Sequence, residues 1–332
     1  MRLHLCINIQ TNTLPKFADT LLSQEKNTNL IKAEAVRLGF MSCGIAKAMQ
    51  MDEDAARLEL WLKKGYHSGM QYMERNFDLR IDPRKLVPGA RSVITLLLNY
   101  YPSAERRPEA PKIAKYAYGI DYHYVIKDKL NELLQYIKGN IGEVTGRGFV
   151  DSAPVLERSW AVRSGLGWVG KNGNVLTRQS GSFFFIATLI TDLDLITDAP
   201  FATDHCGTCT RCIDACPTQA IVSPTEIDAG KCISYLTIEL KDALIPSEFH
   251  TRMEGWMFGC DICQDVCPWN RFSKENTEPS FTPIPEILNL SLQEWEAMTE
   301  ETFNKTFKNS PLKRSKWKGI QRNIKAIKQG NG

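Results

Sequence analysis

Eight of the ten cysteines lie between residues 206 and 267, and their spacing is typical of iron–sulfur ligands. The first four follow the pattern C-x2-C-x2-C-x3-C and are followed directly by Pro217. In bacterial ferredoxins such a run provides three thiolates to one 4Fe–4S cluster and the fourth thiolate to a second cluster. Since each cluster takes four thiolates, eight cysteines are the number that two clusters need. This stretch is therefore predicted to carry electrons.

The second half of the stretch is irregular. It reads Cys260-x2-Cys263-x3-Cys267 followed by Pro268, which is one ligand short of a full run, and Cys232 can supply the missing thiolate. A crossed ligation pattern then gives two sets of four ligands. The first cluster is expected on Cys206, Cys209, Cys212 and Cys267, and the second on Cys216, Cys232, Cys260 and Cys263.

Zinc and disulfide bonds are the competing interpretations of these cysteines. Zinc also binds paired C-x2-C motifs, but it does not require the four-cysteine run with its trailing proline. A disulfide framework needs an oxidising compartment, and the N-terminal residues MRLHLCINIQTNT contain no apolar region long enough for export. The longest apolar stretches, 93–98 and 183–190, are far shorter than the ~20 residues of a membrane span. We therefore expect a cytoplasmic protein without membrane contact.

The residues before the cysteines must bind whatever the electrons reduce, and the chain length of 332 residues suits about two domains. Apolar residues at helical spacing predict helices from residue 28 to the glycine at 39 and over 53–64. A further helix is predicted over 122–138, and buried strands over 91–101 and 182–191. This loose alternation predicts an α/β or α+β layer structure.

Glycines are densest between residues 146 and 181. The segment G-L-G-W-V-G at 165–170 matches a dinucleotide-binding motif by letter, but the preceding ERSWAVRS has a helical rather than a strand pattern. A nicotinamide-binding fold is therefore not expected. Either these glycines let the backbone approach a large flat ligand, or they only form turns.

The C-terminal residues 302–332 contain nine cations and no acid, and they include Trp317. Since the whole chain carries a net charge of +3, the rest of it carries −6. A basic tail on an acidic body favours contact with a phosphate backbone, although a solvated helix end has the same composition. The cations are Lys305, Lys308, Lys313, Arg314, Lys316, Lys318, Arg322, Lys325 and Lys328.

Several segments upstream of the cysteines, in order, carry a resemblance to a known family. They are YAYGIDYHYVIKDKL at 116–130 and GRGFVDSAPVLERSWAVRSGLGWVGKNGNVL at 146–176, and SPLKRSKWKGIQRN follows the cysteines. With the cysteine pattern, they resemble the epoxyqueuosine reductase family over about residues 27–328. The resemblance implies an α+β fold in which a nitroreductase-like cobalamin-binding domain is joined to a bacterial ferredoxin-like domain with two 4Fe–4S clusters. We expect an extension at 1–24, the cobalamin-binding domain at 25–195, the cluster domain at 196–285 and a helical basic segment at 286–332.

The same resemblance implies a reaction, in which the epoxide of epoxyqueuosine is reduced to the alkene of queuosine at the wobble position of tRNA. The implied cofactors are cobalamin and two 4Fe–4S clusters. The implied partners are a tRNA with epoxyqueuosine in its anticodon loop and an external low-potential electron donor, and a monomer is the default expectation. Many family members continue into a helical-repeat domain, so this short form is expected to hold tRNA through its basic tail.

Individual roles also follow from the resemblance. Asp151 is expected to be the proton donor, with a pKa raised by burial against the corrin face so that the carboxyl is protonated near neutral pH. Ser234 and Asp261 flank ligands of the second cluster, which is therefore expected to be the one nearer the cobalamin. His123 is not expected to ligate cobalt. Cobalamin contacts are expected from Asp151, Gly170, Lys171, Asn172, Val175, Ile186, Ser234 and Asp261, and substrate contacts from Asp121, His123, Tyr124 and Arg158.

Two other functions remain open at this point. A cobalamin-dependent reductive dehalogenase-like enzyme is one, although no twin-arginine export signal stands near the N-terminus. A non-catalytic two-cluster electron-transfer protein is the other. Such a protein would not need the D-Y-H, D-S-A-P and G-W-V-G-K-N segments.

Overall fold

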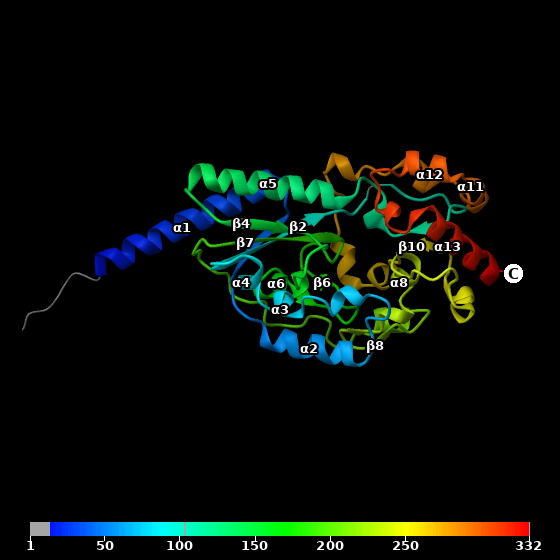
Figure 1. The fold of residues 1–332 in the computed structure, drawn as a ribbon, viewed down its shortest axis with the longest axis horizontal. Coiled ribbons are helices and arrows are strands. Elements are labelled where there is room, and N and C mark those ends of the chain that lie inside the picture. Colours follow the sequence, from blue (N-terminus) through cyan, green and yellow to red (C-terminus); the bar gives the residue numbers. More distant parts are fainter. Residues whose placement is uncertain (1–13, 103, 332) are drawn as a thin grey trace, which may run out of the picture.

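A four-stranded antiparallel sheet forms the centre of the N-terminal part of the molecule (Figure 1). The computed structural model describes residues 14–102 and 104–331. The strand order is β1-β2-β7-β4, and every neighbouring pair is antiparallel. The strands are β1 (Ser42–Lys47), β2 (Ser92–Asn99), β7 (Phe184–Thr191) and β4 (Gly146–Phe149).

Helices cover both faces of this sheet, which is why β2 and β7 are apolar along nearly their whole length. Residues alternate between the faces of a strand, and alternate residues of β2 enter different clusters. Ile94 of β2 packs with Ile31 of α1 (Leu14–Arg37) and Leu130 of α5 (Tyr122–Asn140). Val93 packs on the other face, with Trp160 of α6 (Glu157–Arg163).

Most of the elements predicted for this part are confirmed. The helix at 53–64 is α2 (Asp52–Lys63), the strand at 91–101 is β2, the helix at 122–138 is α5 and the strand at 182–191 is β7. The ERSWAVRS segment is helical, as α6. Strands β1 and β4 were not predicted, since both contain glycine and lack a long apolar run.

The helix predicted from residue 28 begins earlier than expected. Helix α1 begins at Leu14 rather than at residue 28, and its first half projects from the body of the molecule (Figure 1). Leu21 and Leu22 are exposed there. The first 13 residues of the predicted extension lie outside the described residues.

A second core joins the C-terminal half to a short upstream segment. Strand β3 (Lys112–Ile113) pairs in parallel with β10 (Trp256–Phe258), so residues near 113 belong to this core rather than to the sheet. Its largest fully buried side chains include Trp295, Phe303 and Phe307. The chain therefore crosses between the two cores, and the predicted domain boundaries remain predictions.

The remaining helices and strands are short, except for α13. They are α3 (Phe77–Ile81), α4 (Pro83–Leu86), β5 (Trp168–Val169), β6 (Val175–Leu176), α7 (Arg211–Asp214), β8 (Ile221–Ser223), β9 (Glu226–Ile227), α8 (Ile233–Ile238), α9 (Ile262–Asp265), α10 (Pro285–Asn289), α11 (Leu292–Ala297), α12 (Glu300–Thr306), the 3-10 helix η7 (Pro311–Arg314) and α13 (Lys316–Asn331). Among the described helices, none has the length and apolar character that crossing a membrane requires.

Candidate active site and cluster sites

Asp151 stands at a sharp turn directly after β4. Its φ of +54° is in the left-handed region, which a residue with a side chain rarely adopts. The turn is held from α6, because the backbone N–H of Asp151 donates to Oε1 of Glu157 at 2.8 Å. The Asp151 side chain is 64% exposed, so a bound molecule can reach its carboxylate.

The N-terminus of α5 brings two further side chains to this carboxylate. The Tyr122 hydroxyl donates to Asp151 Oδ2 at 2.6 Å, and the Tyr122 ring stacks on Phe185 of β7 with centroids 4.1 Å apart. His123 Nε2 lies 3.6 Å from the same Oδ2 atom. Asp121 caps the helix by accepting from the His123 N–H at 3.0 Å, and its Oδ1 also contacts His123 Nδ1 at 2.7 Å.

The protein residues around Asp151 shift its pKa in the direction opposite to the one expected for burial against a corrin face. Burial does raise this pKa, but the hydrogen bonds from His123 and Tyr122 and the positive charge of Arg314 outweigh it, so the pKa is lowered from its ordinary value. Burial lowers the pKa of His123, but the Asp121 and Asp151 carboxylates raise it to about 9. At neutral pH the exchangeable proton therefore resides on His123, beside an ionised Asp151.

Glu157 is a second group that holds a proton. Burial, followed by the negative charge of Asp151, raises its pKa to about 8. Its Oε1 still accepts from the Asp151 N–H, so one carboxyl both fixes the turn and stays protonated near neutral pH. This residue was not predicted, although it stands in the D-S-A-P-V-L-E-R segment that carries the resemblance.

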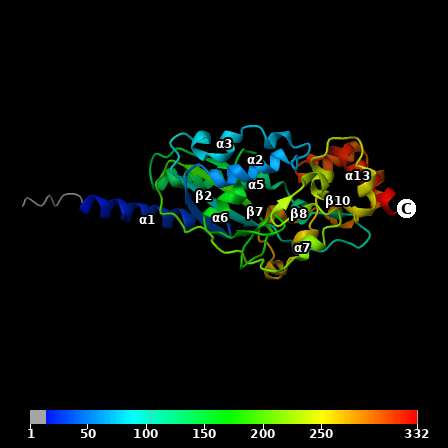
Figure 2. The ribbon, with the colours of Figure 1, turned by 90° about the horizontal axis from the view of Figure 1, so that it is seen from below.

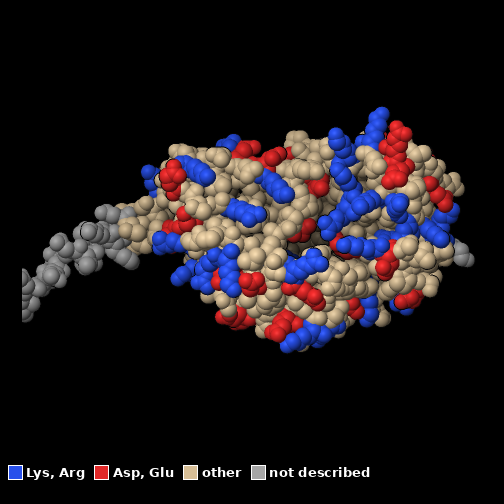
Figure 3. Space-filling view, viewed as in Figure 1, with Lys and Arg blue, Asp and Glu red and all other residues tan. Residues whose placement is uncertain are grey.

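Figure 3 shows a hollow in the middle of one face of the molecule. The hollow lies by the N-terminal end of α5 and beside η7, over which Lys and Arg gather. Arg314 of η7 pairs with Glu239 at 2.9 Å, and its charge lowers the pKa of Asp151. We call this feature the active-site hollow, defined by Asp151, His123, Tyr122 and Arg314.

The basic C-terminal segment is not a free tail. Ile320, Ile324 and Ile327 of α13 are buried in the second core. Arg322 is also buried, and it donates to the carbonyls of Leu236, Leu240 and Asp242. Trp317 donates to the carbonyl of Met298. The prediction that all nine cations are available to a phosphate backbone is therefore wrong for Arg322, while the other eight are exposed.

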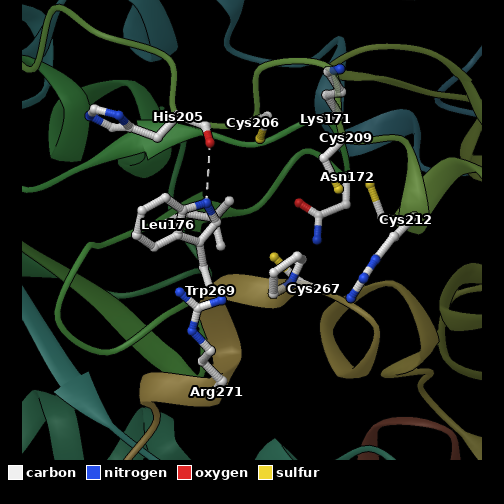
Figure 4. Close-up of a pocket in the computed structure, with 12 residues that line it drawn as sticks. Lys171, Asn172, Leu176, His205, Cys206, Cys209, Cys212, Cys267, Trp269 and Arg271 are labelled. Atoms are coloured by element: carbon white, nitrogen blue, oxygen red, sulfur yellow. Dashed lines mark hydrogen bonds between the residues drawn. The ribbon is translucent and has the colours of Figure 1, made fainter.

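The four cysteines predicted for the first cluster line one cavity of about 210 Å³ (Figure 4). Cys206, Cys209 and Cys212 come from the loop before α7 and from α7 itself, and Cys267 reaches the same space from the loop after α9. Burial raises the pKa of the Cys212 thiol, and the neighbouring Cys206 and Cys267 raise it further. Four sulfurs around a cavity, rather than around one point, suit a 4Fe–4S cluster.

The other four cysteines form a second group in the same way. Burial raises the pKa of the Cys232, Cys260 and Cys263 thiols, with a further rise in Cys263 from Cys232 and Cys216. Cys212 also acts on Cys263, so the two groups are neighbours. The nine cysteines in the described ranges are all free thiols. Within those ranges, no three His, Cys, Asp or Glu side chains converge closely enough for a single metal ion.

The residues expected to contact cobalamin do not all come together. Val175 and Ile186 share one apolar cluster, and Ile186 is the only residue of β7 that is not buried. A Cβ atom at Gly170 would lie only 2.5 Å from Leu176 Cδ1, so the backbone here packs closely against that side chain. These three residues remain compatible with a flat ligand beside the active-site hollow.

Lys171, Asn172 and Asp261 are engaged elsewhere. Lys171 donates to the carbonyl of Gly207 at 2.6 Å, and Asn172 donates to the carbonyl of Cys263 at 3.2 Å while lining the cavity of the first cluster. Asp261 is 2% exposed and accepts from the backbone N–H of Lys115 at 2.7 Å. Burial, opposed by Lys115, raises the pKa of Asp261 to about 6.

The remaining predicted site residues are Ser234, which was expected to contact cobalamin, and Tyr124 and Arg158, which were expected to contact the substrate. Ser234 is part of α8, next to Cys232, and its backbone N–H interacts with the Cys232 thiol. Tyr124 is exposed on the first turn of α5, close in sequence to His123. Arg158 donates to the carbonyl of Gly173 at 2.6 Å, which ties α6 to the glycine-rich loop.

Fold and sites together define a class of protein. An antiparallel α+β layer carries a protonated histidine in contact with an ionised aspartate. The same chain carries two groups of four cysteines that suit 4Fe–4S clusters, and this combination is typical of an iron–sulfur oxidoreductase. Residues 205–270 match a family model described as a 4Fe-4S double cluster binding domain. Residues 80–152 match one described as epoxyqueuosine reductase QueG, DUF1730.

Sequence identity to named relatives shows to which family this chain belongs. The epoxyqueuosine reductase of Cellulophaga algicola is 59% identical over 306 residues, which cover 92% of this chain and 99% of that protein. The epoxyqueuosine reductase of Escherichia coli is 41% identical over 91% of this chain and 80% of that protein. This chain therefore belongs to the epoxyqueuosine reductase family.

Solved structures agree with this membership. A crystal structure of epoxyqueuosine reductase with an epoxyqueuosine-modified tRNA-Tyr stem loop matches with a TM-score of 0.81 and 31% identity, covering 95% of this chain and 81% of that one. The Bacillus subtilis enzyme matches with a TM-score of 0.83 and 30% identity, over 95% of this chain and 82% of that one. In that structure an aspartate-bearing catalytic loop is swung out of the active site.

Proposed function

We propose that this chain reduces epoxyqueuosine to queuosine in tRNA. The observation that carries the proposal is the active-site hollow, where Asp151, His123 and Tyr122 hold a proton, in a chain that also carries the cysteines for two clusters. Converting an epoxide to an alkene consumes two electrons and two protons and releases the oxygen as water. The clusters supply the electrons one at a time, and the hollow supplies protons to the oxygen.

A proton can reach the epoxide oxygen through two residues of the hollow. His123 is the protonated group at neutral pH, and its Nε2 is 3.6 Å from Asp151 Oδ2. A substrate that covers the exposed Asp151 removes water from it and raises its pKa. The proton then passes from His123 to Asp151 and on to the leaving oxygen, which keeps Asp151 as the immediate donor.

Tyr122 and Glu157 keep the donor in place. Tyr122 holds Asp151 Oδ2 through its 2.6 Å hydrogen bond, and Glu157 holds the Asp151 backbone in its left-handed conformation. Both contacts act before the substrate arrives, so the geometry that the reaction needs is already formed.

Cobalamin is the cofactor that we propose beside the hollow. The half-buried Ile186, the buried Val175 and the close-packed Gly170 offer an apolar wall and nearby backbone where a flat ring can approach. When bound, cobalamin supplies a reduced cobalt centre that takes part in breaking the carbon–oxygen bond, which a cluster cannot do alone. Lys171 and Asn172 act at the first cluster instead, since both line its cavity.

The proposed electron path runs from the first cluster to the second. The thiols of Cys212 and Cys263 belong to different groups yet interact, so the two clusters would be adjacent. Asn172 spans them, because it lines the first cavity and donates to the carbonyl of Cys263. The second cluster would pass the electrons on to the cobalamin.

The tRNA would lie over the face shown in Figure 3, where Lys and Arg gather beside the hollow. The exposed cations of η7 and α13 include Lys313, Lys316 and Lys318. A phosphate backbone placed on them can direct its anticodon loop toward Asp151. Because tRNA is the substrate, we propose the cytoplasm as the location.

The experiment that tests this function is complementation of a bacterial strain that lacks its own epoxyqueuosine reductase. Expression of this chain in the presence of cobalamin should convert the epoxyqueuosine of bulk tRNA into queuosine, measured by mass spectrometry of the nucleosides. The Asp151→Asn variant should leave epoxyqueuosine in place. Unchanged epoxyqueuosine with a stably expressed, iron-loaded wild-type chain would contradict the proposal.

A further inference from the structure

The cavity of the first cluster is surrounded by cations. Its lining includes Lys171, Arg211 and Arg271 together with His205, and it includes no carboxylate (Figure 4). Arg178 adds a fourth cation at the edge, where its guanidinium donates to His205 Nε2 at 2.7–3.1 Å. Three of these cations are exposed, namely Arg178, Arg211 and Arg271. We call Lys171, Arg178, Arg211 and Arg271 the cation rim.

Carboxylates near the rim are held by local contacts. Asp204 accepts from the backbone N–H of Cys206 at 2.7 Å, and Asp214 accepts from the Thr210 hydroxyl at 2.7 Å. Neither forms an ion pair with a rim cation. Both carboxylates already accept a hydrogen bond within the loop, so they do not cover Arg178, Arg211 and Arg271, whose exposed charges remain available to a partner beside the cluster.

The residues at the centre of the cation rim are small and exposed to solvent. Gly207 and Thr208, between two ligands of the first cluster, are both exposed. A Cβ atom added at Gly207 would meet no atom within 4 Å, so another protein surface can come close to the backbone there. Close approach matters because the rate of electron transfer falls steeply with distance.

Aromatic side chains extend the rim on one side. The Arg271 guanidinium lies 4.4 Å from the ring centroid of Phe272, which is 38% exposed. Trp269 lines the cavity and donates to the carbonyl of His205 at 3.2 Å. A rim of arginine and exposed aromatic residues is typical of protein-binding surfaces.

The rim and the active-site hollow lie on different sides of the molecule. In Figure 2, α7, which carries Arg211, lies at the edge opposite to α2 and α3. These two helices lie at the front of Figure 1, on the face that carries the hollow in Figure 3. A protein on the rim would therefore leave the tRNA face free.

We propose that the cation rim is the docking surface for an acidic protein that carries a one-electron redox group. The inference rests on the proposed function, since it requires a 4Fe–4S cluster in this cavity. In each encounter the donor loses one electron and the cluster gains it, changing from the 2+ to the 1+ state. Two encounters provide the two electrons that one epoxide consumes.

The test measures reduction of the clusters in the anaerobic holoenzyme by two reductants. One probe is flavodoxin hydroquinone, an acidic flavoprotein, and the other is dithionite, a small reductant without a docking surface. Stopped-flow bleaching of the cluster absorbance gives both rates, and their ratio corrects each variant for cluster content. The rim variants are Arg211→Glu and Arg271→Glu. The control is Lys138→Glu, which makes the same charge reversal at an exposed residue of α5, away from the rim.

Each rim variant should lower the flavodoxin-to-dithionite rate ratio roughly tenfold at low salt, because reversing one charge changes steered association by that order. High salt should remove most of the difference. The affinity for flavodoxin, measured by the fluorescence of its flavin, should fall in parallel. Lys138→Glu should leave both the ratio and the affinity unchanged.

Two results would overturn the proposal. One is an unchanged ratio and affinity in both rim variants. The other is weaker binding of a tRNA stem loop with unchanged flavodoxin binding, which would make the rim a phosphate-binding surface. Failure of the proposed function is distinguishable, because iron content and dithionite-driven conversion of epoxyqueuosine report it without any docking partner.

Discussion

The substitution Asp121→Asn separates the charge of Asp121 from its structural role. Asp121 accepts from the His123 N–H at the start of α5, and asparagine is an equally good helix cap. The change therefore keeps the cap but removes the negative charge that lies 2.7 Å from His123 Nδ1. If that charge keeps His123 protonated, the variant should lose activity at alkaline pH with little loss of stability.

The size of the effect follows from the pKa of His123. The rise from the ordinary 6.5 to about 9 corresponds to roughly 3.4 kcal/mol in favour of the protonated form. Asp121 contacts His123 at 2.7 Å and Asp151 only at 3.6 Å. We therefore assign about 2 kcal/mol to Asp121, which brings the pKa in the variant to about 7.5.

The assay is the pH dependence of kcat/KM for reduction of an epoxyqueuosine-bearing stem loop. Activity needs the protonated histidine, so it should fall as the pH rises through the pKa of His123. The alkaline limb should move from about 9 in the wild type to about 7.5, making Asp121→Asn roughly eightfold slower at pH 8.5. At pH 6 the two proteins should agree within about twofold.

A matched control is available on the same helix. Asp128 is an exposed carboxylate of α5, and Asp128→Asn makes the same change in charge away from the hollow. In this control variant, kcat/KM should fall at the same alkaline pH as in the wild type. An alkaline limb that stays near 9 in Asp121→Asn would refute the reasoning, because the proton would then not depend on the pair of Asp121 and His123.

Three further predictions concern the donor, the clusters and the tRNA face. Asp151→Asn should lower turnover by about 10²–10⁴-fold while iron and cobalamin contents stay normal; activity near the wild type would exclude Asp151 as the donor. Cys267→Ser should lower the iron content from about eight to about four atoms per chain, and an unchanged iron content would exclude it as a ligand. Replacing Lys313, Lys316 and Lys318 by glutamine should make the dependence of log K for stem-loop binding on log salt shallower by about 2–3, whereas an equal slope would place the tRNA elsewhere.

The ligand sets of the clusters were the part of the site most accessible from sequence. Ligation requires sulfur atoms at fixed spacings, and the turn that carries Cys206, Cys209 and Cys212 is local in the chain. The assignment of Cys267 to this group needed only the known crossed pattern, and the cavity lining agrees with it. The buried strands were equally accessible, since a continuous apolar run reveals a strand that is covered on both faces.

The direction of the Asp151 pKa shift could not be predicted from the sequence in this way. Its pKa depends on Tyr122 and His123, which precede it by 29 and 28 residues and meet it only because α5 begins where β4 ends. Burial alone predicts a raised pKa, and only the contacts show that two donors and one cation reverse the direction. Glu157 illustrates the opposite case, in which burial prevails.

The basic C-terminal segment shows what charge counting leaves out. Counting gives nine cations, but it cannot tell which side of a helix faces the core. Ile320, Ile324 and Ile327 recur at helical spacing and bury one side of α13, and this brings Arg322 inside with them. Deleting the segment would therefore remove part of the core, and substitutions of single exposed lysines are the appropriate test.

The most direct measurement is a reaction of the purified holoenzyme with a stem loop that carries epoxyqueuosine. Dithionite as the reductant makes the assay independent of any docking protein, and reactions with and without cobalamin are compared by nucleoside mass spectrometry. We predict loss of one oxygen atom from the modified base, with two electrons consumed per alkene formed, only when cobalamin is present. An enzyme loaded with both clusters and cobalamin that binds the stem loop but leaves its epoxide intact would contradict the account.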